Sequence, residues 1–216
     1  MSMQIITIKD KNYPELLKKI YNPPQKLYIF GKLKKQEKYP LAIVGARKIS
    51  NYGKRITRLF AETLAKAGMT IVSGLAIGVD GLAHQIALEK NARTIAVLGS
   101  GLNIIYPPAH KKLAQGIIDS GGAVISEYPP NTSPTKKTFP ARNRIISGLS
   151  FGVLVVEASK KSGALITART AIEQGREVFV IPGRINDFNS EGCNYLIKMG
   201  ARLVTDPEEI IESLIC

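Results

Sequence analysis

Short apolar runs alternate with helical patterns from residue 41 to the end of the chain, and this alternation limits the possible folds more than any other feature. The strand-like runs are 41–44, 70–73, 94–98, 123–126, 152–157, 177–181 and 202–204. Four apolar residues after the first run are spaced as on one face of a helix: Ile56, Leu59, Phe60 and Leu64. Gly68 follows where that helix would end. The alternation predicts an α/β fold with a doubly wound, mostly parallel sheet, in which ligands bind at the carboxyl ends of the strands.

Residues 1–38 are too short to form a domain of their own. They contain nine Lys residues, a short helical pattern at 13–17 that ends before Pro23-Pro24, and a strand-like run at 27–31. We therefore expect a single domain formed by residues 39–216, with residues 1–38 docking on its sheet as an N-terminal extension.

The charge of the chain points to an anionic partner. Thirty Lys and Arg against seventeen Asp and Glu give a formal net charge of +13, which favours nucleic acid over a membrane surface. The two cysteines, Cys193 and Cys216, indicate no disulfide framework and a reducing compartment. Because no apolar run reaches the roughly 18 residues of a membrane span and no signal-peptide pattern begins the chain, we expect a cytoplasmic protein with no membrane contact.

Three successive loops that follow strand-like runs are rich in glycine: 44–53, 73–80 and 98–103. Glycine lets the backbone turn tightly and bring its N–H groups close to a ligand, so these loops predict an anion-binding edge, with plain tight turns as the alternative. The first loop, Gly45-Ala46-Arg47, lacks the second glycine of the dinucleotide fingerprint, and no acidic residue ends run 70–73. This argues against a nicotinamide dehydrogenase.

Two segments combine many cations with no acids. Six Lys and Arg residues lie between Glu37 and Glu62, and no Asp or Glu lies between Glu127 and Glu157. The second segment contains Lys136, Lys137 and Phe139 in front of the buried-looking run 152–157. Cations beside an aromatic ring suit a single-stranded nucleic acid, whose bases are free to stack. The alternative is a helix N-terminus whose arginines are solvated and whose phenylalanine belongs to the core.

Catalytic chemistry is difficult to find in this sequence. His84 and His110 are the only histidines, and with two distant cysteines they give no metal-ligand spacing. Neither a nucleophile elbow nor a Walker A loop occurs. Asp80, Glu127 and Glu157 lie near strand ends and could act as general bases. A simpler interpretation has Asp80 capping a helix or orienting a loop, and the two glutamates pairing with nearby arginines. We expect no enzyme activity, no metal and no cofactor.

Motifs that resemble one known family follow each other in order along nearly the whole chain. They include Gly45-x-Arg47-x-x-Ser50-x-Tyr52-Gly53, Ser73-Gly74-x-Ala76-x-Gly78-x-Asp80-x-x-Ala83-His84, Gly99-x-Gly101-x-x-x-x-Tyr106-Pro107, Ser126-Glu127-Tyr128-Pro129-Pro130, Phe139-Pro140-x-Arg142-Asn143-Arg144-Ile145-Ile146, Ser162-Gly163-x-Leu165-Ile166-Thr167-Ala168 and Gly192-Cys193-Asn194-x-Leu196-Ile197-x-x-Gly200-Ala201. With these motifs the sequence resembles the DNA-processing protein A (DprA/Smf) family.

The resemblance implies an extended Rossmann-like fold that binds single-stranded DNA, protects incoming strands in natural transformation and loads the RecA recombinase. Arg47, Lys136 and Phe139 match family positions implicated in DNA contact. The full set of predicted DNA-binding residues is Gly45, Arg47, Ser50, Ser73, Gly74, Lys136, Lys137, Phe139, Arg142, Asn143 and Arg144. The resemblance also implies a homodimer, with Asn194, Ile197 and Leu203 matching interface positions.

The sequence differs from many family members in showing neither an N-terminal helical domain nor a C-terminal winged-helix domain, which puts in doubt the duplex-binding or DNA-bridging roles that those domains supply.

A second hypothesis for the function is a nucleotide-binding or nucleoside-monophosphate-hydrolysing protein of the related lysine decarboxylase-like type. Those hydrolases use a Pro-Gly-Gly-x-Gly-Thr loop, and the corresponding region here, 161–167, lacks it.

Overall fold

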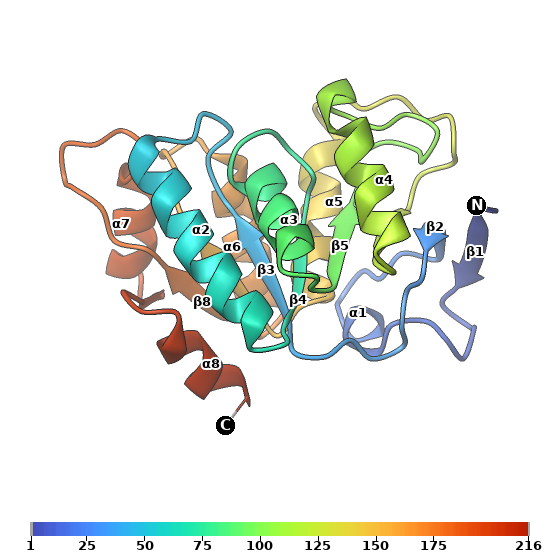
Figure 1. The fold of residues 1–216 in the computed structure, drawn as a ribbon, viewed down its shortest axis with the longest axis horizontal. Helices are drawn as coiled ribbons and strands as arrows, with labels where there is room; N and C mark the ends of the chain where they lie inside the picture. Colours follow the sequence, from blue (N-terminus) through green and yellow to red (C-terminus); the bar gives the residue numbers. More distant parts are fainter. Residues whose placement is uncertain (1, 216) are drawn as a thin grey trace.

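The computed structural model describes residues 2–215, which form one nine-stranded sheet with helices on both faces (Figure 1). The strand order is β1-β2-β6-β5-β4-β3-β7-β8-β9; β1 and β2 are antiparallel to their neighbours and all other pairs are parallel. The strands are β1 (Gln4–Thr7), β2 (Lys26–Gly31), β3 (Pro40–Val44), β4 (Thr70–Ser73), β5 (Thr94–Val97), β6 (Ala123–Ser126), β7 (Gly152–Val155), β8 (Glu177–Val180) and β9 (Arg202–Leu203). The predicted doubly wound, mostly parallel α/β class is confirmed.

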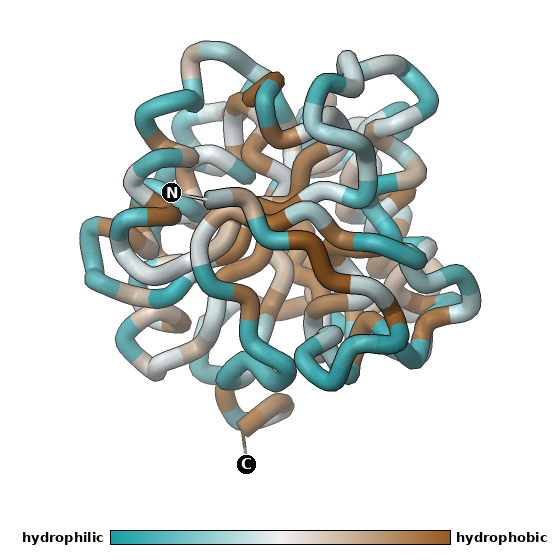
Figure 2. The backbone as a smooth tube through the Cα atoms, turned by 90° about the vertical axis from the view of Figure 1, so that its right-hand side faces the viewer, coloured by the Kyte–Doolittle hydropathy of each residue, from teal (hydrophilic) through white to brown (hydrophobic). Residues whose placement is uncertain are grey.

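Alternate residues of the strands face opposite helix layers. In β3, Leu41 and Ile43 pack on one side while Ala42 and Val44 pack on the other. The first layer consists of α2 (Asn51–Lys66), α3 (Val79–Glu89), α4 (Lys111–Asp119) and α8 (Glu208–Ile215). The second consists of α1 (Glu15–Lys18), α5 (Thr138–Gly148), α6 (Gly163–Glu173) and α7 (Glu191–Lys198). Figure 2 shows that hydrophobic residues are concentrated in the centre of the molecule and hydrophilic residues at its periphery.

The N-terminal segment extends the sheet. Strands β1 and β2 form an antiparallel pair, and β2 pairs antiparallel with β6. Between them the hydroxyl of the buried Tyr13 donates a hydrogen bond to the carbonyl of Pro24 at 2.7 Å, which ties α1 to the turn before β2. Strand β1 was not among the predicted runs, since it is a four-residue edge strand with little burial.

The strand order reverses between β3 and β7. The chain moves from β3 through β4 and β5 to β6 in one direction, and from β7 through β8 to β9 in the other. At such a switch point the loops after two adjacent strands diverge and leave a crevice at the carboxyl edge of the sheet. The loops after β3 and β7 are therefore the expected location of a ligand site.

The first turn of α5 follows Lys137, so Phe139 lies at a helix N-terminus, which is the position that the alternative interpretation gave it. Arg142 of this helix is buried, however, and not solvated as that interpretation expected. The last strand, β9, lies at the edge of the sheet next to β8.

Candidate nucleic-acid interface

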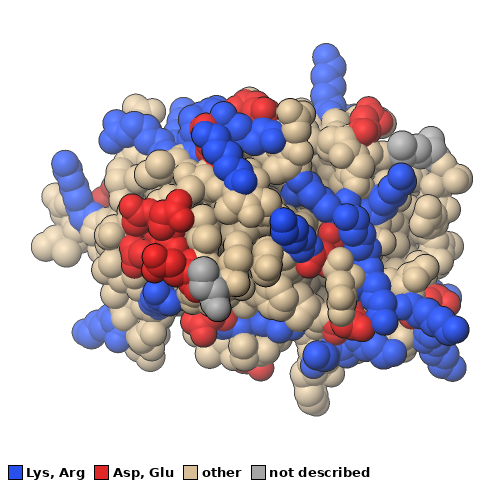
Figure 3. Space-filling model, turned by 60° about the horizontal axis from the view of Figure 1, so that its bottom comes forward, with Lys and Arg blue, Asp and Glu red and all other residues tan. Residues whose placement is uncertain are grey.

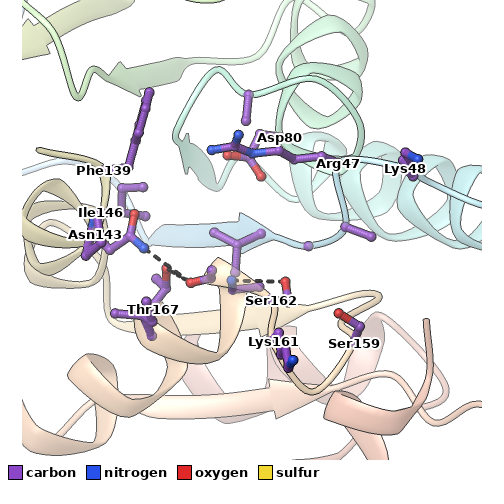
Figure 4. A pocket seen from close by; sticks show the side chains of 18 of the residues that line it. Arg47, Lys48, Asp80, Phe139, Asn143, Ile146, Ser159, Lys161, Ser162 and Thr167 are labelled. Atoms are coloured by element: carbon purple, nitrogen blue, oxygen red, sulfur yellow. Dashed lines mark hydrogen bonds between the residues drawn. The ribbon is translucent and has the colours of Figure 1, made fainter. Parts of the chain in front are cut away.

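A groove of about 660 Å³ opens at the switch point (Figure 4). Its walls come from segments far apart in the sequence: residues 44–48 after β3, 159–164 after β7, the start of α5, and Phe188 and Asn189 after β8. The N-terminus of α6 borders the groove, and the Ser162 hydroxyl there accepts a hydrogen bond from the Ala164 N–H at 3.2 Å. The groove therefore combines the positive end of a helix with the diverging loops of a doubly wound sheet.

Five cations line this groove: the buried Arg142 and four others, Arg47, Lys48, Lys136 and Lys161. The side chains of these four others are exposed, and none of them forms an ion pair with a carboxylate of residues 2–215. Within the same range Asp80 is the single acid that lines the groove, and it is buried. The exposed cations outnumber it and attract polyanions, so the groove is electropositive.

Phe139 provides the aromatic surface of the groove. It is half-buried, and its ring lies against Gly99, where an added Cβ would come within 2.8 Å of its Cδ1. The guanidinium carbon of Arg47 lies 5.3 Å from the ring centroid, and the ring of Tyr106 lies 5.7 Å away at an interplanar angle of 49°. Packing on several sides fixes the ring at the mouth of the groove, so Phe139 belongs neither wholly to the core nor to the solvent.

Arg142 holds the floor of the groove together. It is buried, and its guanidinium donates hydrogen bonds to the carbonyls of Gly74, at 2.8 Å, and Val97. The buried Asp80 accepts the Gly74 N–H at 3.1 Å, which confirms the interpretation that Asp80 orients a loop. Gly74 lies between the two side chains, because an added Cβ would be 2.6 Å from Arg142 Nη2 and 2.7 Å from Asp80 Oδ2. Burial raises the pKa of Asp80, and Arg142 opposes that shift; burial lowers the pKa of Arg142 to about 10.

Glu157, two residues after β7, connects its own loop to the loops after β3 and β8 by hydrogen bonds. Its buried carboxylate accepts hydrogen bonds from Ser50 N at 3.0 Å, from the Ser50 hydroxyl, and from Asn189 Nδ2 at 3.4 Å. Asn189 Nδ2 also donates to the Lys48 carbonyl at 2.9 Å. Gly53 lies against the same carboxylate, where there is no room for a side chain. The predicted pairing of Glu157 with an arginine is therefore wrong, because this carboxylate is used to fix backbone and amide groups.

The predicted DNA-binding residues divide into three groups. Those that line the groove are Gly45, Arg47, Lys136, Phe139, Arg142 and Asn143. Gly74 borders a smaller adjoining hollow, and Lys137 is exposed beside Lys136. Ser50, Ser73 and Arg144 are engaged elsewhere: Ser50 caps α2, the buried Ser73 hydroxyl donates to the Ile43 carbonyl at 2.6 Å, and Arg144 pairs with Glu127 at 2.5 Å in a separate hollow. The pairing of Glu127 with an arginine is thus confirmed, while DNA contact by these residues remains a prediction.

Several groove residues are absent from the predicted DNA-binding set. They include Lys48, Ser159, Lys161, Ile166, Phe188 and Asn189. Most of them lie in the loops after β7 and β8. These loops reach the groove because β7 and β8 directly follow β3 in the strand order. Lys48 is one of the six cations of the predicted basic segment between Glu37 and Glu62.

His84, in α3, has a structural role. His84 is fully buried, with Nδ1 2.6 Å from Thr94 Oγ1, and burial lowers its pKa to about 3. In residues 2–215 no group of three or more His, Cys, Asp or Glu side chains is placed to hold a metal ion. Of the helices in the same range, none combines the length and the apolar character that crossing a membrane requires.

Comparison with known proteins decides the family. The model of the DNA recombination-mediator protein A family matches residues 4–215. The chain belongs to this family, the DprA/Smf proteins. Protein Smf of Escherichia coli is 53% identical over 210 residues, which cover 97% of this chain and 56% of that protein. A second curated Smf protein, from Synechocystis, is covered to 54%. The chain thus spans about half the length of these two DprA/Smf relatives.

Solved structures of the DprA family share the fold closely. DNA processing protein A from Streptococcus pneumoniae superposes with a TM-score of 0.91 at 43% identity, over 99% of this chain and 75% of that one. DNA processing protein A from Helicobacter pylori superposes with a TM-score of 0.87 at 35% identity, over 99% and 95% of the two chains, and was solved to describe its single-stranded DNA binding mode. The extended Rossmann-like architecture implied by the sequence resemblance is confirmed.

Proposed function

We propose that this chain binds single-stranded DNA in the switch-point groove, without catalysing a reaction on it. The observation that supports this most strongly is a groove lined by four exposed, unpaired cations and by the half-buried ring of Phe139, which Arg47 contacts. Cations bind phosphates regardless of sequence, and an aromatic face stacks on any base, so the binding would show little base preference. A duplex keeps its base faces stacked on one another, so it would use the cations but not the ring.

The carboxylates at the groove support binding over hydrolysis. Asp80 and Glu157 both accept hydrogen bonds from loop groups, and their roles are to hold those loops in place. A general base needs a free acceptor within reach of the substrate proton. The geometry therefore favours the binding hypothesis over the nucleotide hydrolase that the sequence left open.

The wider role follows from the family. A relative in Helicobacter pylori has a described single-stranded DNA binding mode, and the resemblance implies protection of incoming strands and loading of the RecA recombinase in transformation and recombination. We assign the same role to this chain, in the cytoplasm, where a buried free thiol such as Cys193 remains reduced. A strand-exchange assay with RecA and a single-strand-binding protein would test the loading step.

Salt-dependent binding of oligo-dT tests the DNA proposal. If the four exposed groove cations each neutralise one phosphate, the slope of log K against log salt should be about −2.8, from about 0.7 per phosphate on a single strand. Phe139→Ala should weaken binding by about 1–3 kcal/mol through lost stacking and leave the slope unchanged. Phe151→Ala is the matched control, since Phe151 is partly exposed at the opposite end of the sheet. Tighter binding to duplex than to oligo-dT, or release of base from nucleoside monophosphates, would overturn the proposal.

We further propose a homodimer formed at the β9 edge of the sheet. Leu203 is 43% exposed on this two-residue edge strand, and Tyr195 and Met199 expose apolar surface on α7 and at its end. Edge strands leave backbone groups unpaired and are often covered by a partner. The other two predicted interface residues face inward: Asn194 bonds both backbone groups of Gly183, and Ile197 packs partly against the core.

Light scattering on two variants tests the dimer. Leu203→Arg should give a folded monomer, because a two-fold contact places the new charge in the interface twice. Ile197→Glu should lower the melting temperature as well, since it adds a charge beside the core. A monomeric wild-type protein, or a Leu203→Arg variant that remains a dimer, would rule out this interface.

A further inference from the structure

Phe188 is an aromatic side chain in the groove that the sequence motifs do not explain. It is 69% exposed, although a phenylalanine gains stability from burial, and it lines the same groove as Lys48 and Lys161. Ile166, 42% exposed, lies in the groove too. An exposed ring beside unpaired cations repeats the chemistry found around Phe139.

The loop that presents Phe188 is held firmly in place. Asn189, the next residue, donates from Nδ2 to the Lys48 carbonyl at 2.9 Å and to Glu157, and its own carbonyl accepts the Ala158 N–H at 2.7 Å. At the start of the loop the Tyr52 hydroxyl donates to the Pro182 carbonyl at 3.0 Å. These bonds join the loop after β8 to the loops after β3 and β7. The backbone that carries Phe188 is therefore held against the loops after β3 and β7, which carry Lys48 and Lys161.

The two phenylalanines mark opposite ends of the groove. Phe139 rests on Gly99, which follows β5, whereas Phe188 lies in the loop after β8. Four strand intervals separate β5 from β8 in the sheet, which at about 4.8 Å each amounts to roughly 19 Å. At a rise of about 3.4 Å per stacked nucleotide this span corresponds to at most about six nucleotides, and to fewer in an extended strand. Arg47, at the end of β3, lies between the two rings along this edge.

We propose that Phe188 forms a second nucleobase subsite, so that one DNA strand runs along the carboxyl edge with bases stacked at both ends of the groove. This inference rests on the proposed single-stranded DNA binding. Lys48 and Lys161 hold the phosphates near the second subsite, and Ile166 adds apolar contact to the sugar or base. The first subsite at Phe139 acts alone on short strands, and both act on strands long enough to span the groove.

The test compares oligo-dT of increasing length, from dT3 to dT12, on four variants. With the wild-type protein the affinity should rise with length until the strand reaches Phe188. Phe188→Ala should lower the affinity for dT12 about 5- to 20-fold with an unchanged salt slope, and should leave dT3 binding unaltered. Phe188→Trp should restore the affinity because it keeps an aromatic face, and Phe188→Leu should not.

Ile185→Ala is the matched control, since Ile185 is 94% exposed in the same loop and does not line the groove. Equal affinities of the Phe188→Ala and Ile185→Ala proteins for dT12 would overturn the inference, as would full binding by Phe188→Leu, which would assign Phe188 a merely apolar contact. A wild-type protein that binds no oligo-dT refutes the proposed function itself, so the two failures are distinguishable. Thermal melting of each variant confirms that differences arise in the folded state.

Discussion

The two ends of the sheet are both rich in cations, yet they use them differently. At the amino-end half, five Lys and Arg side chains pair with acids: Lys35 with Glu15, Arg58 with Glu89, Lys66 and Lys90 with Glu62, and Arg93 with Glu37. Others there, such as Lys34 and Lys38, form no ion pair with residues 2–215. Figure 3, which turns the lower side of the Figure 1 view forward, shows blue side chains with red ones beside them. At the carboxyl end, the four exposed groove cations have no such partners among residues 2–215.

The difference lies in where the acids are placed. Asp80 and Glu157 are present at the carboxyl end but are buried and bound to backbone and amide groups, so they shape the loops and leave the exposed cations unpaired. In the surface ion pairs at the amino end, each acid offsets the charge of the cation that it contacts. A basic composition therefore indicates an anionic partner, but the site is located by unpaired cations that line a groove together with an aromatic ring.

The largest expected effect separates the two arginines of the groove. Arg142→Ala should lower the free energy of unfolding by about 3–5 kcal/mol, because it leaves two buried carbonyls without donors and Asp80 without its nearby cation. Arg47→Ala, in contrast, should leave stability nearly unchanged and weaken DNA binding for all sequences. Denaturant unfolding and oligo-dT binding on both variants give the comparison. A stable Arg142→Ala protein that fails to bind DNA would make Arg142 a DNA ligand.

The next effect concerns the carboxylate that joins the groove loops. Glu157→Ala should cost about 2–3 kcal/mol of unfolding free energy, because the Ser50 N–H and hydroxyl and the Asn189 amide lose an acceptor. It should also weaken oligo-dT binding, because Lys48 and Phe188 are no longer held in place. Electrostatics alone predicts the opposite change in affinity, because removing an acid near a basic groove strengthens the attraction of the groove for DNA. Tighter binding by the variant would therefore show that Glu157 does not position the groove.

How much of this could be read from the sequence depends on how local each feature is. Runs such as 41–44 and 70–73 predicted buried parallel strands because every residue in them is apolar or small, and the glycine loops predicted an anion-binding edge. Arg142 could not be placed, because its partners Gly74 and Val97 are 68 and 45 residues away in the sequence. Phe188 and Lys161 were missed because their loops reach the groove only through the strand order.

Acidification should affect stability without affecting the groove cations. Burial lowers the pKa of His84 to about 3, so between pH 6.5 and 3 the unfolded chain binds a proton that the folded chain does not. Stability must then fall as pH falls, by up to about 2 kcal/mol between pH 6.5 and 5 at about 1.36 kcal/mol per pH unit. His84→Gln should flatten this part of the stability profile measured by urea unfolding at several pH values. An unchanged profile in the variant would assign the acid sensitivity to other groups.

The smallest effects compare single lysines at the two ends of the sheet. Lys48→Ala and Lys161→Ala remove unpaired groove cations and should each reduce the salt slope for oligo-dT by about 0.7, the value for one phosphate contact on a single strand. Lys34→Ala and Lys38→Ala remove exposed lysines around a hollow at the amino end and should leave the slope unchanged. All four should keep the wild-type melting temperature, since none of these side chains holds the core. Net charge changes equally in every variant, so any general attraction between a basic protein and DNA would lower the slope in all four alike. A difference between the two pairs therefore measures the contribution of position, and equal slopes would show that DNA responds to the total charge and not to the groove.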